Sequence, residues 1–202
     1  MALTRFPITN PVGDMVAQYR DPDEKLYASV ELNQVAFPKT GMVVSQVPLG
    51  AAFTKNAPCE NGMWLVGDKA AGALNAPAAA TDSPIGIVYT TEKEYDMMHY
   101  GLQRFGRKIA GDYPRLGLFG LGDTVTTNCL QYDDTEFATF AALETALAAI
   151  ATTPLYVKAV AGSPVPQITK TKPSAGTYAK VVKYYTIPNG GKGVKYQIVS
   201  LG

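Results

Sequence analysis

Catalysis in this chain would have to pass through its only histidine, His99. Ser-His-Asp and Cys-His mechanisms both require an imidazole hydrogen-bonded to a nucleophile. Nothing in the sequence ties His99 to Cys59 or Cys129, and no Gly-x-Ser-x-Gly motif is present. One histidine and two distant cysteines also fall short of the four ligands of a structural zinc site. We therefore expect no catalytic residue, no metal site and no cofactor, and hence a protein that is not an enzyme.

Two acidic segments have the composition of functional sites without the required spacing. After Asp21-Pro22-Asp23-Glu24, an EF-hand loop would need a ligand and then glycine, but Lys25 and Leu26 follow. The carboxylates of Asp133, Asp134 and Glu136 could act as a pair in glycoside hydrolysis. A simpler explanation of these three acidic residues is that they lie at the N-terminus of a helix, where the helix dipole is positive. We expect the first segment to be a turn and the second to be the start of a helix.

Basic and aromatic residues offer binding chemistry in place of catalysis. Arg104, Arg107 and Lys108 lie close in sequence to Tyr100 and Phe105, and such a cluster can contact a phosphate backbone or an acidic protein patch. The formal net charge of +1 favours the protein contact over nucleic acid.

Tyrosine rings could instead form a platform for sugars, as in a carbohydrate-binding module, since the chain has 12 tyrosines. Tyr184 and Tyr185 point to opposite faces of one strand and cannot form a single platform. Tyrosine is also common in ordinary strands and interfaces. Carbohydrate binding therefore remains the alternative function.

The composition fits a subunit that is normally assembled. Charged residues make up 17% of the chain, below the roughly 25% of an ordinary soluble domain. Lys+Arg at 18 against Asp+Glu at 17 leaves no overall field for nucleic acid or an anionic membrane. We expect no secretory signal and no membrane span. Cys59 and Cys129 are expected to be buried free thiols in a chain made in a reducing cytoplasm, with a disulfide as the alternative.

Short runs rich in Val, Tyr and Thr alternate with turn residues and predict a mainly β fold, a small β-barrel or β-sandwich. The strand-like runs are Met15–Tyr19, Leu26–Val30, Met42–Val47, Met63–Val66, Ile85–Thr90, Thr124–Leu130, Leu155–Val160, Tyr178–Ile187 and Val194–Ser200. The last two should form a hairpin, and Gly162–Pro173 should be a Pro-rich connection. We expect residues 15–202 to form a single domain, with a surface loop at the Ala/Gly/Pro-rich stretch 70–84.

One helix is predicted at about 135–151. Phe137, Phe140, Leu143, Leu147 and Ile150 recur at steps of three or four and form one apolar stripe. Asp134 is the expected N-cap, and Pro154 follows the end. A short helix within Glu92–Tyr100 is a weaker expectation.

Residues 1–14 are predicted to form an extended arm that packs on another subunit, with a frayed terminus as the alternative. Pro7, Pro11 and Gly13 interrupt any periodicity, while Phe6 and Ile8 have little local surface to cover. We therefore expect Phe6, Pro7, Ile8 and Pro11, with Arg104 and Arg107, to contact a partner.

The segment Gly122-Asp123-Thr124-Val125-Thr126-Thr127-Asn128, preceded by Tyr113-Pro114-Arg115, resembles structural proteins of tailed bacteriophages. It is most similar in style to small head-decoration, or cement, proteins and related auxiliary capsid proteins. These combine a loose N-terminal arm and a small β-barrel or sandwich with one helix. Their closing strand resembles Val194–Val199.

The resemblance implies a mechanical function. Such proteins bind the outside of an expanded capsid and clamp neighbouring major capsid subunits, often as trimers. It therefore implies the major capsid protein as partner, a homo-oligomer, and a location on the virion after synthesis in the host cytoplasm. A tail or connector subunit is a related alternative.

Overall fold

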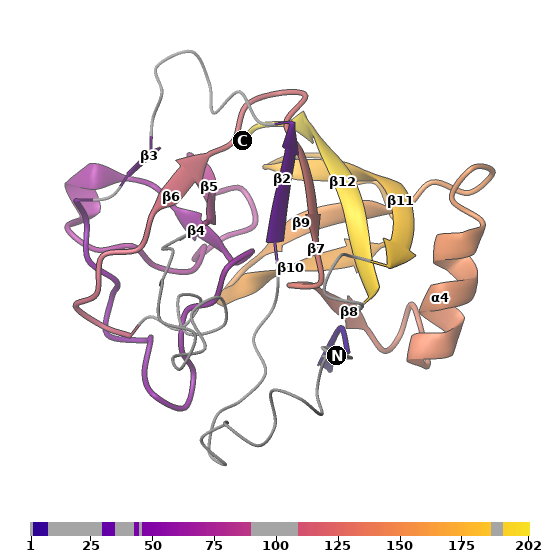
Figure 1. Cartoon of the computed structure of the whole chain (residues 1–202), viewed down its shortest axis with the longest axis horizontal. Helices are drawn as coiled ribbons and strands as arrows, with labels where there is room; N and C mark the ends of the chain where they lie inside the picture. Colours follow the sequence, from indigo (N-terminus) through magenta and orange to yellow (C-terminus); the bar gives the residue numbers. More distant parts are fainter. Residues whose placement is uncertain (1, 8–29, 35–42, 45, 90–108, 187–191) are drawn as a thin grey trace, which may run out of the picture.

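A computed structural model describes residues 2–7, 30–34, 43–44, 46–89, 109–186 and 192–202. Its strands form two sheets, which lie on opposite sides of the molecule in Figure 1. The larger sheet has the order β1 (Leu3–Arg5), β8 (Gln131–Asp133), β10 (Ser163–Thr169), β9 (Tyr156–Val160), β11 (Tyr178–Thr186), β12 (Lys192–Ser200), β7 (Thr124–Thr127) and β2 (Val30–Gln34). The smaller sheet has the order β3 (Val43–Val44), β6 (Leu116–Leu118), β5 (Ile85–Val88) and β4 (Trp64–Val66). The predicted mainly β class is confirmed.

Strand pairing is antiparallel throughout both sheets except between β8 and β10, which run parallel. The longest pair is the hairpin of β11 and β12, whose register runs from Tyr178↔Ser200 to Thr186↔Lys192. This is the hairpin expected from the sequence. Two bulges interrupt it, and the extra residues of these bulges are Val182 and Val199.

The first hydrophobic core lies between the two sheets. Alternation along β12 turns Val194, Tyr196 and Ile198 inward, where they meet Trp64 of the smaller sheet. The indole Nε1 of Trp64 donates a buried hydrogen bond of 3.0 Å to the Tyr196 hydroxyl. Their rings also meet edge to face, with centroids 5.8 Å apart. The indole and phenol thus join the two sheets by a polar contact as well as by packing.

A second core lies on the other side of the smaller sheet. Leu65, next to Trp64 on β4, points away from the first core and packs with Leu116, Phe53 and Met63. Both cysteines, Cys59 and Cys129, belong to this second core. The smaller sheet is therefore buried on both faces, which explains the apolar character of β4 and β5.

The N-terminal residues belong to the larger sheet, and the prediction of a separate arm is wrong for them. β1 pairs with β8, and the Phe6 N–H donates to the Leu130 carbonyl at 2.9 Å. The Phe6 side chain is 1% exposed and meets the Phe140 ring edge to face, with centroids 4.8 Å apart. Phe6 has apolar surface to cover, because residues far along the chain supply it. The rest of the predicted arm lies outside the described residues.

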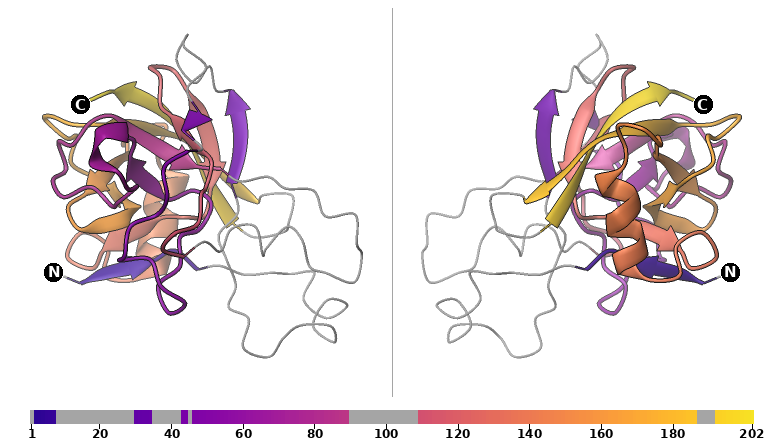
Figure 2. Two further views of the ribbon diagram at one scale, coloured as in Figure 1. Left: turned by 90° about the vertical axis from the view of Figure 1, so that its left-hand side faces the viewer. Right: turned by 90° about the vertical axis from the view of Figure 1, so that its right-hand side faces the viewer.

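The α-helix among the described residues is α4 (Phe140–Ala148), shorter than predicted. Thr139, and not Asp134, is its N-cap: the Thr139 hydroxyl accepts a hydrogen bond from the Ala142 N–H. Residues 133–137 form a separate turn, in which the Asp133 carbonyl accepts from Glu136 and Phe137. The stripe prediction holds, since Phe137, Leu143 and Leu147 are buried, and Phe140 and Ile150 pack against the same core. Figure 1 shows α4 next to β11, on the side of the molecule away from the smaller sheet, and the right-hand view of Figure 2 looks onto this helix.

The predicted connection Gly162–Pro173 is largely a strand, β10, and that prediction is wrong. Pro164 and Pro166 fit in a strand because the pairing with β9 jumps from Ser163 to Gln167, so neither proline sits at a ladder position. The Gln131 side chain donates to the Val165 carbonyl at 2.6 Å and to the Ser163 hydroxyl at 3.0 Å. These bonds replace part of the missing backbone ladder.

The 70–84 stretch begins within the 3₁₀ turn η1 (Lys69–Ala71), and most of it is exposed. Leu74 is an exception, since it is fully buried in the second core. The predicted strand Met15–Tyr19, most of Leu26–Val30 and the predicted short helix in Glu92–Tyr100 lie outside the described residues.

Candidate functional site

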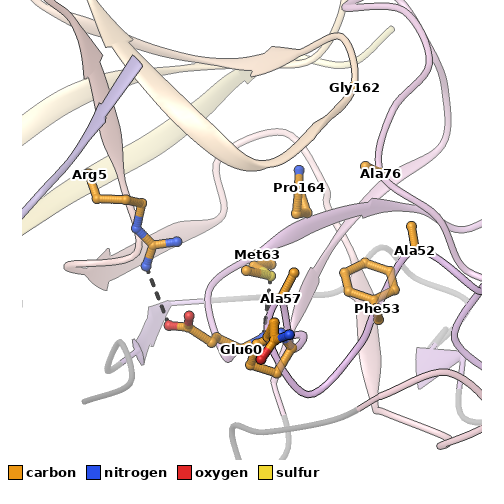
Figure 3. A pocket seen from close by; sticks show the side chains of 11 residues that line it. Arg5, Ala52, Phe53, Ala57, Glu60, Met63, Ala76, Gly162 and Pro164 are labelled. Atoms are coloured by element: carbon orange, nitrogen blue, oxygen red, sulfur yellow. Dashed lines mark hydrogen bonds and ion pairs between the residues drawn. The ribbon is translucent and has the colours of Figure 1, made fainter. Parts of the chain in front are cut away.

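A cavity of about 410 Å³ opens between β1, the 52–63 segment and the start of β10 (Figure 3). Its lining is mostly apolar and is made by Arg5, Ala52, Phe53, Asn56, Ala57, Pro58, Glu60, Met63, Ala76, Gly162 and Pro164. In Figure 3 the charged residues Arg5 and Glu60 lie at one end, and Phe53, Ala52 and Ala76 lie at the other. The cavity can hold a small apolar group.

An ion pair closes the polar end of this cavity. The Arg5 Nη2 atom lies 3.3 Å from Glu60 Oε2, and the two side chains are 34% and 13% exposed. Arg5 comes from β1, while Glu60 follows the buried Cys59. The pair fastens β1 to the segment that covers the second core. Because both charges are engaged with each other, this end of the cavity offers little to a charged ligand.

The two thiols lie behind this ion pair as free cysteines, as predicted. Burial raises the pKa of Cys129 to about 12, and the neighbouring Arg5 guanidinium only partly opposes this. Burial also raises the pKa of Cys59, with Cys129 and Glu60 adding to the effect. A thiol held protonated in an apolar core is a poor nucleophile. These cysteines therefore behave as small core residues.

Carboxylates of the described residues serve as acceptors for the chain's own hydrogen bonds. Glu136 accepts from the Thr169 hydroxyl at 2.7 Å and from the Lys170 N–H at 2.6 Å. Hydrogen bonds from Thr135 lower the pKa of Asp133. The same use is seen for Glu60, Asp68, Asp82, Asp112, Asp123, Asp134 and Glu144. Asp133 and Glu136 thus fix the turn before α4 and the end of β10. The prediction that they lie at the start of the helix is wrong, since the first turn of α4 has no acidic residue.

Lysines, in contrast, gather on the outer face of the larger sheet. Alternation along β9, β11 and β12 turns one set of residues, which includes Tyr184 and Tyr196, towards the first core and the other set, rich in lysine and tyrosine, outward. The lysine–tyrosine face consists of Tyr156, Lys158, Tyr178, Lys180, Lys183, Tyr185 and Lys195. The valines at the two bulges, Val182 and Val199, are 49% and 41% exposed beside it.

Between β9 and β11, the cross-strand register places each tyrosine of this face opposite a lysine. Tyr178 lies opposite Lys158, and Lys180 lies opposite Tyr156. The Tyr156 and Tyr178 rings meet edge to face at 74°, with centroids 6.3 Å apart. In the described part of the chain, none of the four lysines of the face forms an ion pair. The described residues therefore give this face a positive charge.

The predicted contact residues do not come together in the described structure. Phe6 is buried in the first core and is unavailable to a partner, which corrects that prediction. Pro7 is exposed at the surface. Ile8, Pro11, Arg104 and Arg107 lie outside the described residues, as does His99.

Sequence reasoning missed the lysine–tyrosine face, although a signal for it exists. No Asp or Glu follows Glu144, whereas seven lysines do: Lys158, Lys170, Lys172, Lys180, Lys183, Lys192 and Lys195. The overall net charge of +1 hides this uneven distribution. Combined with strand alternation, it could have placed several lysines on one face.

None of the helices in the described ranges has the length and hydropathy needed to cross a membrane. The same ranges contain no group of three or more His, Cys, Asp or Glu residues placed to hold a metal ion. Comparison with known proteins adds no relationship: no protein-family model, no curated protein and no solved structure matches this chain.

Proposed function

We propose that the chain is a non-enzymatic structural protein of a tailed-bacteriophage virion, which binds and stabilises the capsid shell as a decoration or auxiliary capsid protein. The observation that carries the proposal is the lysine–tyrosine face, whose lysines have no described ion pair and whose neighbours Val182 and Val199 are exposed. A sheet surface with charged, aromatic and apolar groups suits docking onto another protein. The resemblance of residues 113–128 to phage structural proteins supplies the identity of the shell.

Electrostatic complementarity supports the choice of partner. Carboxylates such as that of Glu136 are engaged within the chain, while the lysines of the face point outward. A partner that matches this face presents carboxylates, which steer association and set its orientation. The major capsid protein fills this role in the proposal, and several copies of the chain around one shell position would form the homo-oligomer, a trimer in the simplest case.

Co-sedimentation with shells assembled from the major capsid protein of the same genome tests the proposal. The wild-type chain should sediment with expanded shells, and K180E/K183E should lose at least tenfold in affinity. The matched control K55E/K172E makes the same charge change at exposed lysines away from the face and should bind as the wild type does. A wild-type chain that stays in the supernatant would show the proposal to be wrong.

The predicted contacts outside the described residues need a separate experiment. Deletion of residues 2–12 would also remove β1 and Phe6 from the sheet and core, and so would confuse binding with folding. Substitution of Ile8 and Pro11 by serine, or of Arg104 and Arg107 by alanine, avoids this problem. If these residues contact the shell, each double variant should bind more weakly while its circular dichroism stays native.

Carbohydrate binding remains the second candidate, and the three tyrosines on one sheet face favour it. The edge-to-face arrangement of Tyr156 and Tyr178 counts against it, because a sugar ring stacks on a flat aromatic surface. A glycan titration decides between the two functions. Saturable glycan binding that is lost in Tyr178→Ala would replace the shell proposal. A tail or connector location would be recognised by binding to those assemblies and not to shells.

A further inference from the structure

We infer that Lys183, Lys195 and Tyr185 form a carboxylate-binding site that takes aspartate or glutamate side chains of an acidic partner protein. This inference rests on the proposed function only in taking the partner to be a protein. It adds to it a defined site and a ligand chemistry.

The two lysines are direct cross-strand partners. Lys183 of β11 pairs with Lys195 of β12, and both side chains are on the outer face of the sheet. Directly opposite residues have Cβ atoms about 4.5–5.5 Å apart, so two ammonium groups share one small area. Like charges in this arrangement repel each other. An anion placed between them would remove the repulsion and gain two charge-assisted hydrogen bonds.

Tyr185 fixes the position of this pair. Its ring centroid lies 5.3 Å from the Lys183 Nζ atom and 5.9 Å from the Lys195 Nζ atom, so both ammonium groups gather at one ring. Its hydroxyl is 2.9 Å from the Thr126 hydroxyl, which holds the ring in place. The residue opposite Tyr185 is Gly193, which has no side chain of its own and is buried. The contacts of Tyr185 thus prearrange the site.

The described structure supplies no internal anion for this site. The nearest acidic residue by register is Glu31, which pairs with Thr126 and lies two strands from Lys195, roughly 10 Å away at the backbone. Glu136 and Glu144, the acidic residues closest to this part of the sequence, bond to Thr169, Lys170 and Tyr184. Among the described side chains, therefore, no carboxylate pairs with either lysine.

The ring geometry favours a protein carboxylate over nucleic acid. Single-stranded nucleic acid binds to sheets by stacking bases on free aromatic faces. Here the ammonium groups of two lysines lie at the Tyr185 ring, and Tyr156 and Tyr178 meet edge to face. The exposed Val182, next to Lys183, offers an apolar contact that a protein surface can use and a phosphate backbone cannot.

Binding of fluorescein-labelled poly-L-glutamate to the full chain, followed by anisotropy at low salt, tests the inference. The wild type should bind, and K183Q/K195Q should weaken binding at least tenfold. The matched control K55Q/K172Q removes the same charge at exposed positions off the face and should stay within twofold. K183Q/K195Q should fold, because it relieves a like-charge contact, and native Trp64 fluorescence checks this.

Three results would overturn the inference: no binding of poly-L-glutamate by the wild type, equal losses in the two variants, or tighter binding of an oligothymidylate of equal charge. The proposed function is tested separately, by co-sedimentation with shells. If shells bind while poly-L-glutamate binding ignores Lys183 and Lys195, only the site is wrong. If poly-L-glutamate binding depends on the pair but shells do not bind, the site stands and the shell proposal fails.

Discussion

At the scale of single residues, Phe6 shows how an apolar side chain without local partners acquires them through the fold. The ring lies against Phe140 with centroids 4.8 Å apart and against Tyr184 with centroids 6.3 Å apart, both edge to face. Its neighbour Pro7 is exposed. The sequence suggests that Phe6 packs against another subunit, but its side chain packs in the chain's own core.

Phe6→Ala should therefore lower the free energy of unfolding by about 3–5 kcal/mol, the usual cost of removing a buried phenylalanine ring. Urea denaturation followed by Trp64 fluorescence measures the loss, since Trp64 is the only tryptophan and lies in the same core. Pro7→Ala is the control and should change stability by less than about 0.5 kcal/mol. Equal, small effects of both substitutions would mean that Phe6 is not part of the core.

At the scale of elements, the turn between β8 and α4 depends on one carboxylate. Asp133 Oδ1 accepts from the Thr135 N–H at 2.8 Å and from the Thr135 hydroxyl at 2.7 Å. These hydrogen bonds favour the ionised form and lower the pKa of Asp133 below its unfolded value of about 3.9. The turn places Glu136 against the end of β10. Loss of the turn would therefore weaken the attachment of both α4 and β10.

The sign of the pH dependence follows from that lowered pKa. The contribution of Asp133 is fully present above its unfolded pKa and is lost as pH falls through the folded pKa. The stability gap between the wild type and Asp133→Asn should therefore be widest near pH 7 and should close in acid. Urea midpoints at pH 7, 5 and 3 measure the gap. Thr135→Val, which removes one of the two donors, should give an intermediate gap, and a gap independent of pH would contradict the assignment.

Elements with local signals could be predicted from the sequence, and elements built from distant residues could not. The hairpin of β11 and β12 has β-branched and aromatic strands around a glycine-rich turn, so its local chemistry is sufficient. In β10, Pro164 and Pro166 suggest a connection, because the Gln131 contacts that make a strand possible come from another strand. β1 needs Leu130 and β8 as partners, which a scan of residues 1–14 alone does not include.

The pair of Lys183 and Lys195 could not be predicted from the sequence because it, too, depends on contacts between separate strands. Lys183 and Lys195 are twelve positions apart, and only the register of the hairpin, with its bulge at Val182, makes them opposite neighbours. Simple alternation from Tyr178 would place Lys183 on the inner face. The bulge shifts it outward, and no propensity rule fixes where a bulge occurs. The excess of lysine after Glu144 is visible in the sequence, but the pairing of Lys183 with Lys195 cannot be predicted from it.

At the scale of the whole molecule, one thin sheet separates two cores. Trp64 and Leu65 are neighbours on β4, yet Trp64 packs in the first core and Leu65 in the second. The same division occurs on β5, where Ile87 faces the first core and Val88 the second. Because β4 and β5 contribute side chains to both cores, neither core can unfold without exposing one face of the shared sheet. The two cores should therefore unfold together.

Two probes report on the two cores separately and test this coupling. Trp64 fluorescence follows the first core, and brief pulses of N-ethylmaleimide follow the second through Cys59 and Cys129. Burial shields both thiols, and the raised pKa of Cys129, about 12, keeps it protonated in the folded state. Labelling should thus appear only on unfolding, at the same urea midpoint as the fluorescence change. Cys59→Ala and Cys129→Ala assign the signal to each thiol. Labelling of either thiol at clearly lower urea would mean that the second core opens on its own and that β4 does not couple the two.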